Sequence, residues 1–284
     1  MWRVEMWLKT LLVLLFAFFL VGAVTVHRPC ACGHEDLSGA EGKHLRLLSW
    51  NIGNGDLEQE TRAHNDDLPV IAKLILEKDA DAIALQELTG EDQLKLLLKQ
   101  LNNRYRGYVS ASGNGDRVDA VLVKKSYGED KLVFSGVAAA GRFAATATFT
   151  FGQDMPQVSL MSAHADAFSA ESRRLFVGDV VDWARSRPKN AVTFIAGDFN
   201  LEVSTRTRNN LFTNDAKHDS ESYSYLLKYF RDLGLNAGET SINDRRIDYI
   251  FGPPTAVRLH QAEVLRGAAV GQMDHWPLLV EVSF

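Results

Sequence analysis

Residues 192–200 read VTFIAGDFN, and this stretch joins a strand-like run to a group of polar side chains. The run VTFIA is β-branched or aromatic at most positions, which is typical of a buried strand. It ends in Gly-Asp-Phe-Asn, where Asp198 and Asn200 interrupt the apolar pattern. A buried carboxylate is costly unless it is paired, hydrogen-bonded or bound to a metal, so this strand end predicts a functional site.

Short apolar runs of the same kind alternate with helical patterns on both sides of this stretch. Their order contains both strand–helix–strand and hairpin connections, which predicts two sheets packed face to face with helices outside, in one domain over residues 44–284. The predicted strands are 45–51, 81–87, 105–111, 119–125, 143–151, 158–165, 192–200, 246–252 and 278–284. The predicted helices are 68–78, 91–101, 170–186 and 222–233.

Side chains that bind metals or carry protons stand at or near the ends of several predicted strands. Taken singly, each has an ordinary explanation as a turn residue, a helix-start acid, a core histidine or a surface charge. Their repetition on successive strands instead predicts that they gather at one rim of the sandwich and form a site. The residues are Asn51, Glu87, His164, Asp198, Asn200, Asp248, Asp274 and His275.

The order of these motifs resembles the endonuclease/exonuclease/phosphatase superfamily, the DNase I-like metal-dependent phosphoesterases. The matching motifs are SWN (49–51), LQE (85–87), SAH (162–164), GDFN (197–200), RIDYIF (246–251) and MDHWP (273–277). The resemblance implies an α+β fold, a four-layered α/β sandwich of two mainly antiparallel sheets with outer helices. It also implies a site at one rim and Mg²⁺ as cofactor, with Mn²⁺ or Ca²⁺ as alternatives.

The metal ligands follow from the resemblance residue by residue. Glu87 looks like the main metal ligand, and Asn51 and Asp274 look like its neighbours at the metal. The chemistry agrees, because a hard cation held by carboxylate oxygens neutralises the charge of a phosphodiester and polarises its P–O bonds.

The resemblance also implies the catalytic groups. Asp198 and Asn200 look like the pair that positions the nucleophile and the phosphate. His275, oriented by Asp248, looks like a general acid or base, since a carboxylate on the second ring nitrogen fixes the tautomer and raises the basicity. His164 looks like the second catalytic or phosphate-binding histidine.

Two features of the sequence concern the residues that would bind the phosphate. Arg142, on the strand before His164, looks like the phosphate-binding arginine of the nuclease branch. That branch usually carries a Tyr and a Glu on the strand after the first hairpin, whereas residues 116–125 here read DRVDAVLVKK. Asp116 and Asp119 are the two candidates to replace them, and the sequence does not choose between them.

The composition is that of an ordinary globular protein, with 284 residues, a net charge of −5, 46% hydrophobic and 24% charged residues. This balance excludes a disordered, collagen-like or coiled-coil chain. The acidic charge excludes the electrostatic signature of a nucleic-acid coat protein, but not an enzyme that meets phosphate through a metal. The two cysteines, Cys30 and Cys32, lie before the domain and are too few for a disulfide framework.

An uncharged apolar run, TLLVLLFAFFLVGAVTV at residues 10–26, precedes the domain. We expect residues 1–26 to be a signal peptide or an uncleaved signal anchor, and residues 27–43 to be a polar linker. The lack of a clear small-residue cleavage site favours the anchor. Either alternative makes the protein membrane-anchored or secreted, with an extracytoplasmic catalytic domain, because the positive flank formed by Arg3 and Lys9 tends to stay in the cytoplasm.

The expected function is Mg²⁺-dependent hydrolysis of a phosphodiester, by an extracytoplasmic nuclease or related phosphodiesterase. Nucleic acid is one candidate substrate, and the basic pairs Arg206/Arg208 and Arg245/Arg246 are candidates to contact flanking phosphates. The alternative is a lipid-directed phosphoesterase of the sphingomyelinase or inositol-phosphate phosphatase type. A third hypothesis, a non-catalytic binding module, requires lost ligands, and the sequence has lost none. The membrane is an expected partner through the N-terminal segment, and no protein partner is implied.

Overall fold

The structure, a computed structural model, describes residues 43–53, 67–111, 117–127, 132–152, 155–203, 216–267 and 273–284. They belong to one unit, Gly42–Phe284. The predicted signal segment 1–26 and all but the last residue of the linker 27–43 lie outside the described residues, so both stay predictions. Within the described ranges, no helix is long and apolar enough to cross a membrane.

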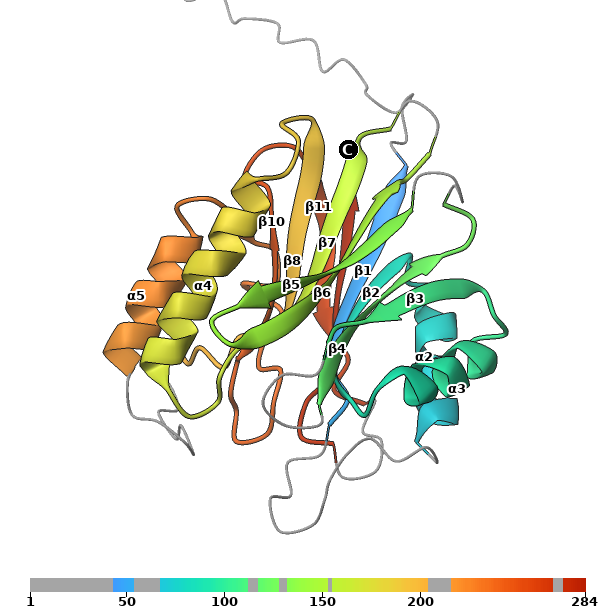
Figure 1. Cartoon of the computed structure of the whole chain (residues 1–284), viewed down its shortest axis with the longest axis horizontal. Helices are drawn as coiled ribbons and strands as arrows, with labels where there is room; N and C mark the ends of the chain where they lie inside the picture. Colours follow the sequence, from blue (N-terminus) through green and yellow to red (C-terminus); the bar gives the residue numbers. More distant parts are fainter. Residues whose placement is uncertain are drawn as a thin grey trace, which may run out of the picture. The chain divides into compact units, whose positions relative to one another are not determined.

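Twelve strands form two sheets of six among the described residues (Figure 1). The first sheet has the spatial order β11 (Arg258–Val264), β12 (Leu278–Ser283), β1 (His44–Asn51), β2 (Ala82–Leu88), β4 (Val118–Lys124) and β3 (Tyr105–Val109). The second has the order β5 (Val133–Ala139), β6 (Arg142–Thr150), β7 (Gln157–His164), β8 (Ala191–Asp198), β10 (Asp248–Gly252) and β9 (Arg231–Asp232).

The described helices are α2 (Leu68–Lys78), α3 (Glu91–Gln100), α4 (Ala170–Arg185) and α5 (Ala216–Leu226). Each sheet has one parallel pair, β1 with β2 and β7 with β8, and the other neighbouring strands are antiparallel. Parallel neighbours need a crossover connection, and here α2 and α4 supply it. The mainly antiparallel sheets and outer helices predicted for the domain are therefore confirmed.

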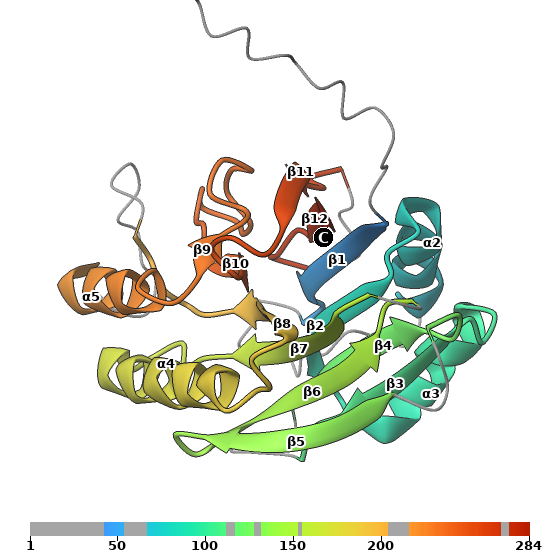
Figure 2. The same cartoon turned by 90° about the horizontal axis from the view of Figure 1, so that it is seen from above.

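Three apolar layers hold the sandwich together, and Figure 2 shows the helices and sheets between which they lie. The middle layer joins the inner faces of the two sheets and includes Leu47, Val121, Val280, Phe149, Leu160 and Phe194. Helices α2 and α3 pack on the outer face of the first sheet through Ile71, Ile75, Leu94 and Leu97. Helix α4 packs on the second sheet through Phe176, Val177, Val180 and Val181. Because side chains alternate along a strand, strands such as β1, β2, β7 and β8 contribute side chains both to the middle layer and to an outer layer.

The predicted helix 222–233 was wrong in its position. Helix α5 ends at Leu226, and Arg231–Asp232 form strand β9, which pairs with Phe251 and Gly252 of β10. A residue paired in a sheet must be extended, so tertiary pairing overrides the helical preference of this stretch. Strands β5, β9 and β11 were not predicted; all three lie at sheet edges, where β5 and β11 are largely exposed and lack an apolar alternation.

The register brings the ends of several strands to one rim. Asp198 pairs with both His164 and Asp248, which aligns the ends of β7, β8 and β10. Between the sheets, the side-chain amide of Gln86 donates to Ser162 Oγ at 2.9 Å, which sets the ends of β2 and β7 at the same depth. The polar ends predicted from the sequence therefore meet at one end of the sandwich.

Candidate active site

A β-bulge turns the side chain of Glu87 into the rim. The pairing of β2 with β4 shifts register between Leu85 and Leu88, and Glu87 has a left-handed φ of 66°. Such a bulge re-aims a side chain that regular alternation would point elsewhere. Gly53 makes room for it, because a Cβ there would lie 1.9 Å from Glu87 Oε2. The glycine after the SWN motif is thus required by the carboxylate it faces.

Asn51 joins the two sheets at the rim. Its amide nitrogen donates to Glu87 Oε1 at 3.2 Å and to Asp198 Oδ2 at 3.1 Å. Its amide oxygen accepts the backbone N–H of Gly53 at 2.9 Å. All three polar side chains are buried. Two carboxylates from different sheets are therefore held together by one neutral amide.

The GDFN motif builds a tight turn at the end of β8. Gly197 has φ of +152°, and a Cβ there would lie 1.8 Å from the carbonyl oxygen of Ala163, so only glycine lets β7 and β8 approach. Asn200 has a left-handed φ of 49°. Its backbone N–H donates to Asp198 Oδ1 at 2.9 Å and its side-chain amide donates to Ala165 at 3.2 Å. The turn fixes the carboxylate of Asp198 in one orientation.

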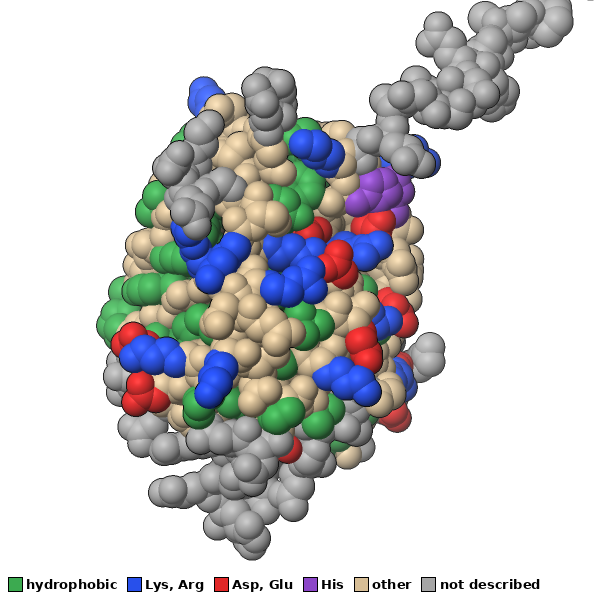
Figure 3. All heavy atoms as spheres, turned by 90° about the vertical axis from the view of Figure 1, so that its right-hand side faces the viewer, with side chains coloured by type: hydrophobic (Ala, Val, Ile, Leu, Met, Phe, Trp, Pro, Cys, Tyr) green, Lys and Arg blue, Asp and Glu red, His purple; other side chains and the backbone are tan. Residues whose placement is uncertain are grey.

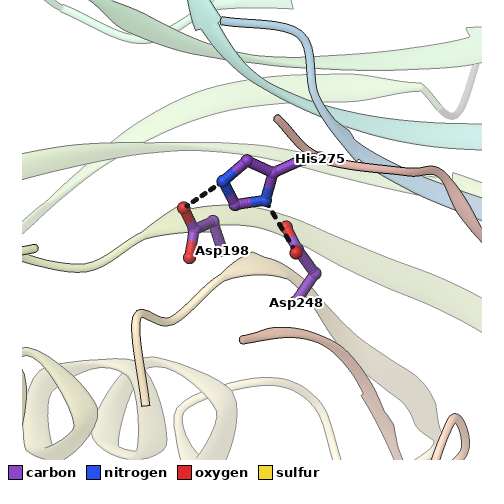
Figure 4. Close-up of side chains that lie close together, drawn as sticks. All are labelled: Asp198, Asp248 and His275. Carbon is purple, nitrogen blue, oxygen red and sulfur yellow. Dashed lines mark hydrogen bonds and ion pairs between the residues drawn. The ribbon is translucent and has the colours of Figure 1, made fainter. Parts of the chain in front are cut away.

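The imidazole of His275 lies between two carboxylates (Figure 4). Its Nδ1 is 2.8 Å from Asp248 Oδ2, and its Nε2 is 3.7 Å from Asp198 Oδ2. Asp248 is itself oriented, because the Thr240 hydroxyl accepts its backbone N–H at 3.0 Å. The second carboxylate oxygen of Asp248 is buried and has no hydrogen-bond partner among the described residues.

Burial and charge act against each other in this group. Burial alone would lower the pKa of His275, but the negative charges of Asp248 and Asp198 prevail and raise that pKa to about 10. Burial also raises the pKa of the Asp198 carboxyl, to about 7, with Asp248 adding to the effect while the His275 charge and hydrogen bonds from Asn200 and Asn51 oppose it. The charge of each group therefore acts on the pKa of the other: His275 lowers the pKa of Asp198, and Asp198 raises that of His275.

The second histidine has the opposite character. His164 Nε2 lies 3.7 Å from Glu87 Oε1 and 3.7 Å from Asp198 Oδ2, too long for a hydrogen bond. Burial lowers the pKa of His164 well below its ordinary value, and the charges of Arg142, His275 and Arg117 add to this. A neutral His164 thus faces a charged His275, which is a separation typical of acid and base partners.

Two arginines reach the site, and only one was predicted. Arg142 lies at the start of β6, and its Nη2 is 3.3 Å from Asp166 Oδ2. Arg117, just before β4, donates to Glu87 Oε2. In the sequence, residues 116–125 were considered only because they lack the Tyr and Glu of the nuclease branch. An arginine at the start of a strand whose partner strand ends in Glu87 was the signal that could have revealed this ion pair.

The residues 116–125 are partly outside the described part of the chain. Asp116 is not among the described residues, whereas Asp119 is buried on β4. Burial raises the pKa of Asp119 well above its ordinary value; Arg142 opposes this, and Glu87 and Asp198 add to it. Asp119 is therefore electrostatically part of the site.

The oxygen-rich donor set fits a hard divalent cation. Ligand atoms of Asp198, Asp248 and His275 lie within 4.8 Å of one another, the one such group among the described residues. The predicted ligands Asn51 and Glu87 are in contact, while Asp274 contacts His275, with its Oδ1 at 3.9 Å from Nε2. The unpartnered buried oxygen of Asp248 is consistent with a metal, and the assignment of individual ligands stays a prediction.

The basic pairs expected to contact flanking phosphates are not supported. Arg245 and Arg246 are buried rather than exposed. Arg245 lies 3.5 Å from a carboxylate oxygen of Glu202, and Arg246 lies 2.6 Å from Asp232. They are structural ion pairs, so the interpretation as phosphate contacts was wrong. Arg206 and Arg208 lie outside the described residues.

A two-sheet sandwich with carboxylates, an asparagine and two histidines at one rim defines the class of metal-dependent phosphoesterases. A sequence profile of the Endonuclease/Exonuclease/phosphatase family matches residues 48–274, and the chain belongs to that family. The predicted enzyme class, a metal-dependent phosphoesterase, is thereby confirmed. No curated protein matches the chain in sequence.

Solved structures share the fold at low sequence identity. Humanized TDP2 of D. rerio is 18% identical, with a TM-score of 0.63 over 85% of this chain and 99% of that one. The human Nocturnin catalytic domain with bound sulfate is 19% identical, with a TM-score of 0.61 over 85% and 94%. A mannosyl-6-phosphatase of Bacteroides thetaiotaomicron is 20% identical, with a TM-score of 0.61 over 84% and 100%. At these identities the likeness extends to the fold alone.

Proposed function

We propose that the protein is a Mg²⁺-dependent phosphodiester hydrolase of the nuclease or related phosphodiesterase type. The observation that carries this proposal is the imidazole of His275 between Asp248 and Asp198, with the carboxylate of Glu87 linked to Asp198 through the amide nitrogen of Asn51. Proton-transfer groups beside an oxygen-rich cation site are the equipment that hydrolysis of an anionic ester requires.

The chain's own residues account for proton movement and positioning. Asp198, held by Asn51 and by the turn at Asn200, faces the same space as His275 Nε2 and takes up the proton of the attacking water. His275 carries a proton on the nitrogen that faces the site and gives it to the leaving oxygen as the P–O ester bond breaks, while Asp248 holds its other nitrogen. A bound divalent cation, held by Glu87, Asn51 and Asp274, would neutralise phosphate charge and polarise the P–O bond.

Surface charge gives limited support for nucleic acid. Figure 3 shows the face at the right of Figure 1, where Lys and Arg side chains are interspersed with Asp and Glu. On the helices α2 and α3, such neighbours form ion pairs, with Lys73 3.7 Å from Glu77 and Lys95 3.2 Å from Glu91. A face of mixed sign does not attract a long polyanion strongly. Recognition of the substrate is therefore expected to depend on the rim.

One observation favours the lipid-directed alternative. Phe168 is 62% exposed and follows Asp166, and Phe143 is 37% exposed and follows Arg142. Two exposed aromatic side chains within two residues of Arg142 and Asp166 in the sequence would suit a substrate with an apolar part next to its phosphate. A lipid phosphodiester has this property.

A panel of substrates separates these possibilities. The full chain, purified in detergent, is assayed on plasmid DNA, single-stranded RNA, sphingomyelin, inositol phosphates and a sugar 6-phosphate, with Mg²⁺ and with EDTA. We expect hydrolysis of at least one diester, abolished by EDTA and restored by excess Mg²⁺. Turnover that persists in EDTA would disprove the metal dependence, and turnover restricted to monoesters would disprove the diester assignment.

We also propose that residues 10–26 anchor the enzyme with its catalytic domain outside the cytoplasm. The apolar run and the positive residues before it support this. Protease added to intact cells or spheroplasts should digest the domain while the undigested protein sediments with membranes. A protected domain would reverse the topology, and a mature protein that begins after residue 26 and is free in the medium would replace the anchor by a signal peptide.

A further inference from the structure

Arg117 stands at the mouth of the site, at the start of β4. Its Nη1 donates to Oε2 of Glu87, whose other oxygen accepts from Asn51. The Arg117 side chain is 38% exposed, whereas those of Glu87 and His164 are nearly buried at 10% and 12%. The guanidinium is thus a part of the site that an arriving anion meets before it reaches the buried groups.

A structural arginine in the same molecule looks different. Arg173 on α4 is fully buried, and Nε and Nη2 both contact Asp219 Oδ1 at 2.8 Å. Its Nη1 donates to the backbone oxygen of Asp166 at 3.0 Å. Arg117 makes a single hydrogen bond to the described residues, and a guanidinium has several more N–H donors to offer. Its exposure and spare donors distinguish it from an arginine that serves packing.

A second guanidinium approaches from the other sheet. Arg142 on β6 is 32% exposed and is held by Asp166, two residues after His164. His164 in turn lies 3.7 Å from the carboxylate that Arg117 binds. Phosphate oxygens are bound by paired guanidinium groups with strong, geometrically specific hydrogen bonds. Each arginine is thus held by a carboxylate that lies close to His164 in space or in sequence, and both act electrostatically on its imidazole.

We propose that Arg117 is a substrate-binding residue whose guanidinium binds the non-bridging oxygens of the substrate phosphate together with Arg142, in addition to its contact with Glu87. This inference rests on the proposed function, because it concerns the same site. It identifies a phosphate-binding residue beside β4, where the sequence motifs did not identify one. The resting contact with Glu87 holds the guanidinium near the position where the phosphate arrives.

Calorimetric titration with inorganic phosphate at saturating Mg²⁺ tests the proposal without requiring turnover. The full-length Arg117→Gln variant should bind phosphate about tenfold more weakly than the wild type, the effect of losing a charge-assisted hydrogen bond. On a hydrolysed diester, KM should rise by a similar factor, with a smaller change in kcat. Arg117→Lys keeps the charge but loses the planar guanidinium, so its phosphate affinity should lie between those of the wild type and Arg117→Gln.

Arg104→Gln is the matched control, because Arg104 is a half-exposed arginine that pairs with Asp79 at 3.4 Å far along the same sheet. It should bind phosphate like the wild type. If Arg117→Gln binds Mg²⁺ more tightly but phosphate equally well, Arg117 only neutralises Glu87 and the proposal is overturned. If Arg117→Gln does not fold, wild-type phosphate affinity in Arg117→Lys overturns it. Weaker phosphate binding in a protein that hydrolyses no diester would instead refute the proposed function alone.

Discussion

Strands β2 and β4 carry an ion pair at each end, and the two pairs use their charges differently. At one end, Lys124 Nζ lies 2.7 Å from Asp81 Oδ1, and both side chains are nearly buried. Asp81 also accepts the hydroxyl of Tyr127 and the backbone N–H of Arg46. At the other end, Glu87 pairs with a half-exposed Arg117.

The difference separates a structural cluster from a functional one. The oxygens of Asp81 and of Glu87 are all satisfied within the protein, but the cation that pairs with Asp81 is nearly buried, whereas Arg117 at the active end is 38% exposed and within reach of a ligand. At the active end, a buried oxygen of Asp248 has no partner among the described residues, and His164 makes only long contacts. Polar groups that are buried and incompletely paired are expensive, and a site keeps them where a substrate or metal completes the bonding.

The largest expected effect comes from the active end. Glu87→Gln keeps the shape but removes the anionic ligand, so kcat/KM should fall by about 10³-fold, or roughly 4 kcal/mol of transition-state stabilisation. Metal-free stability should change by less than about 1 kcal/mol, because the Arg117 partner is half exposed and can be hydrated. Steady-state kinetics and urea unfolding in EDTA measure the two quantities. Near-normal Mg²⁺-dependent turnover in this variant would show that Glu87 is not a metal ligand.

The structural end should behave in the opposite way. Asp81→Ala leaves Lys124 with only the half-exposed Asp79, at 2.9 Å, and removes the acceptor of the Tyr127 hydroxyl and the Arg46 N–H, so it should cost about 3 kcal/mol of unfolding free energy. The kcat/KM at a temperature where the variant is folded should stay within about twofold of the wild type, since no active-site contact is lost. Urea unfolding followed by fluorescence gives the stability. If the variant is as stable as the wild type, or if it folds but has greatly reduced turnover, the assignment of Asp81 to a purely structural cluster is wrong.

A smaller effect is expected from the support of His275. Asp248→Asn removes the charge that raises the pKa of His275, and loss of such a supporting carboxylate typically costs 10–100-fold, or about 2 kcal/mol. The fall should appear in kcat, with Mg²⁺ affinity little changed. Proton NMR of the histidine should show its pKa lower in the variant. A silent substitution would mean that Asp248 neither orients nor charges His275.

Long buried runs were the most predictable part of the fold. Strands such as 192–200 can be predicted because both of their faces are apolar and a polar motif follows the apolar run. The edge strand β5 could not be found in the same way, since Val133 and its neighbours are mostly exposed and its pairing with β6 depends on the whole sheet. The stretch ending in Arg231–Asp232 has helical preference and becomes a strand only because β10 lies beside it.

The candidate site was predictable in its membership and less so in its contacts. Motif order brought Glu87, His164 and Asp198 to one rim, as the structure shows. Arg245 was predicted to contact a flanking phosphate because its buried partner, Glu202, is distant in the sequence. The Arg117–Glu87 pair depends on a bulge, and a bulge has no signature in the side-chain pattern of LQE.

The smallest expected effect concerns Asp166, a satisfied carboxylate at the active end. It accepts the backbone N–H groups of Phe168 and Ser169, each at 2.7 Å, and contacts Arg142 at 3.3 Å. Burial alone would raise the pKa of Asp166, but these hydrogen bonds and the Arg142 charge lower it below the ordinary value of 3.8. By the comparison above, Asp166 should contribute stability as Asp81 does, although it lies beside the site.

The sign of its pH dependence follows from the lowered pKa. A depressed folded-state pKa stabilises the fold above the ordinary value, and this contribution is lost as the pH falls through the folded-state pKa. Asp166→Asn should therefore be less stable than the wild type by under about 1 kcal/mol near neutral pH, since the partly exposed group is screened. The difference should shrink as the pH falls below about 4, where the unfolded wild-type chain binds the proton first, and should disappear below the folded-state pKa. Urea unfolding across this range measures it, with Asp182→Asn as the control, at a residue of α4 whose side chain is 76% exposed. A gap that widens in acid would show that Asp166 stabilises the fold through its protonated form, and would place it with the functional carboxylates.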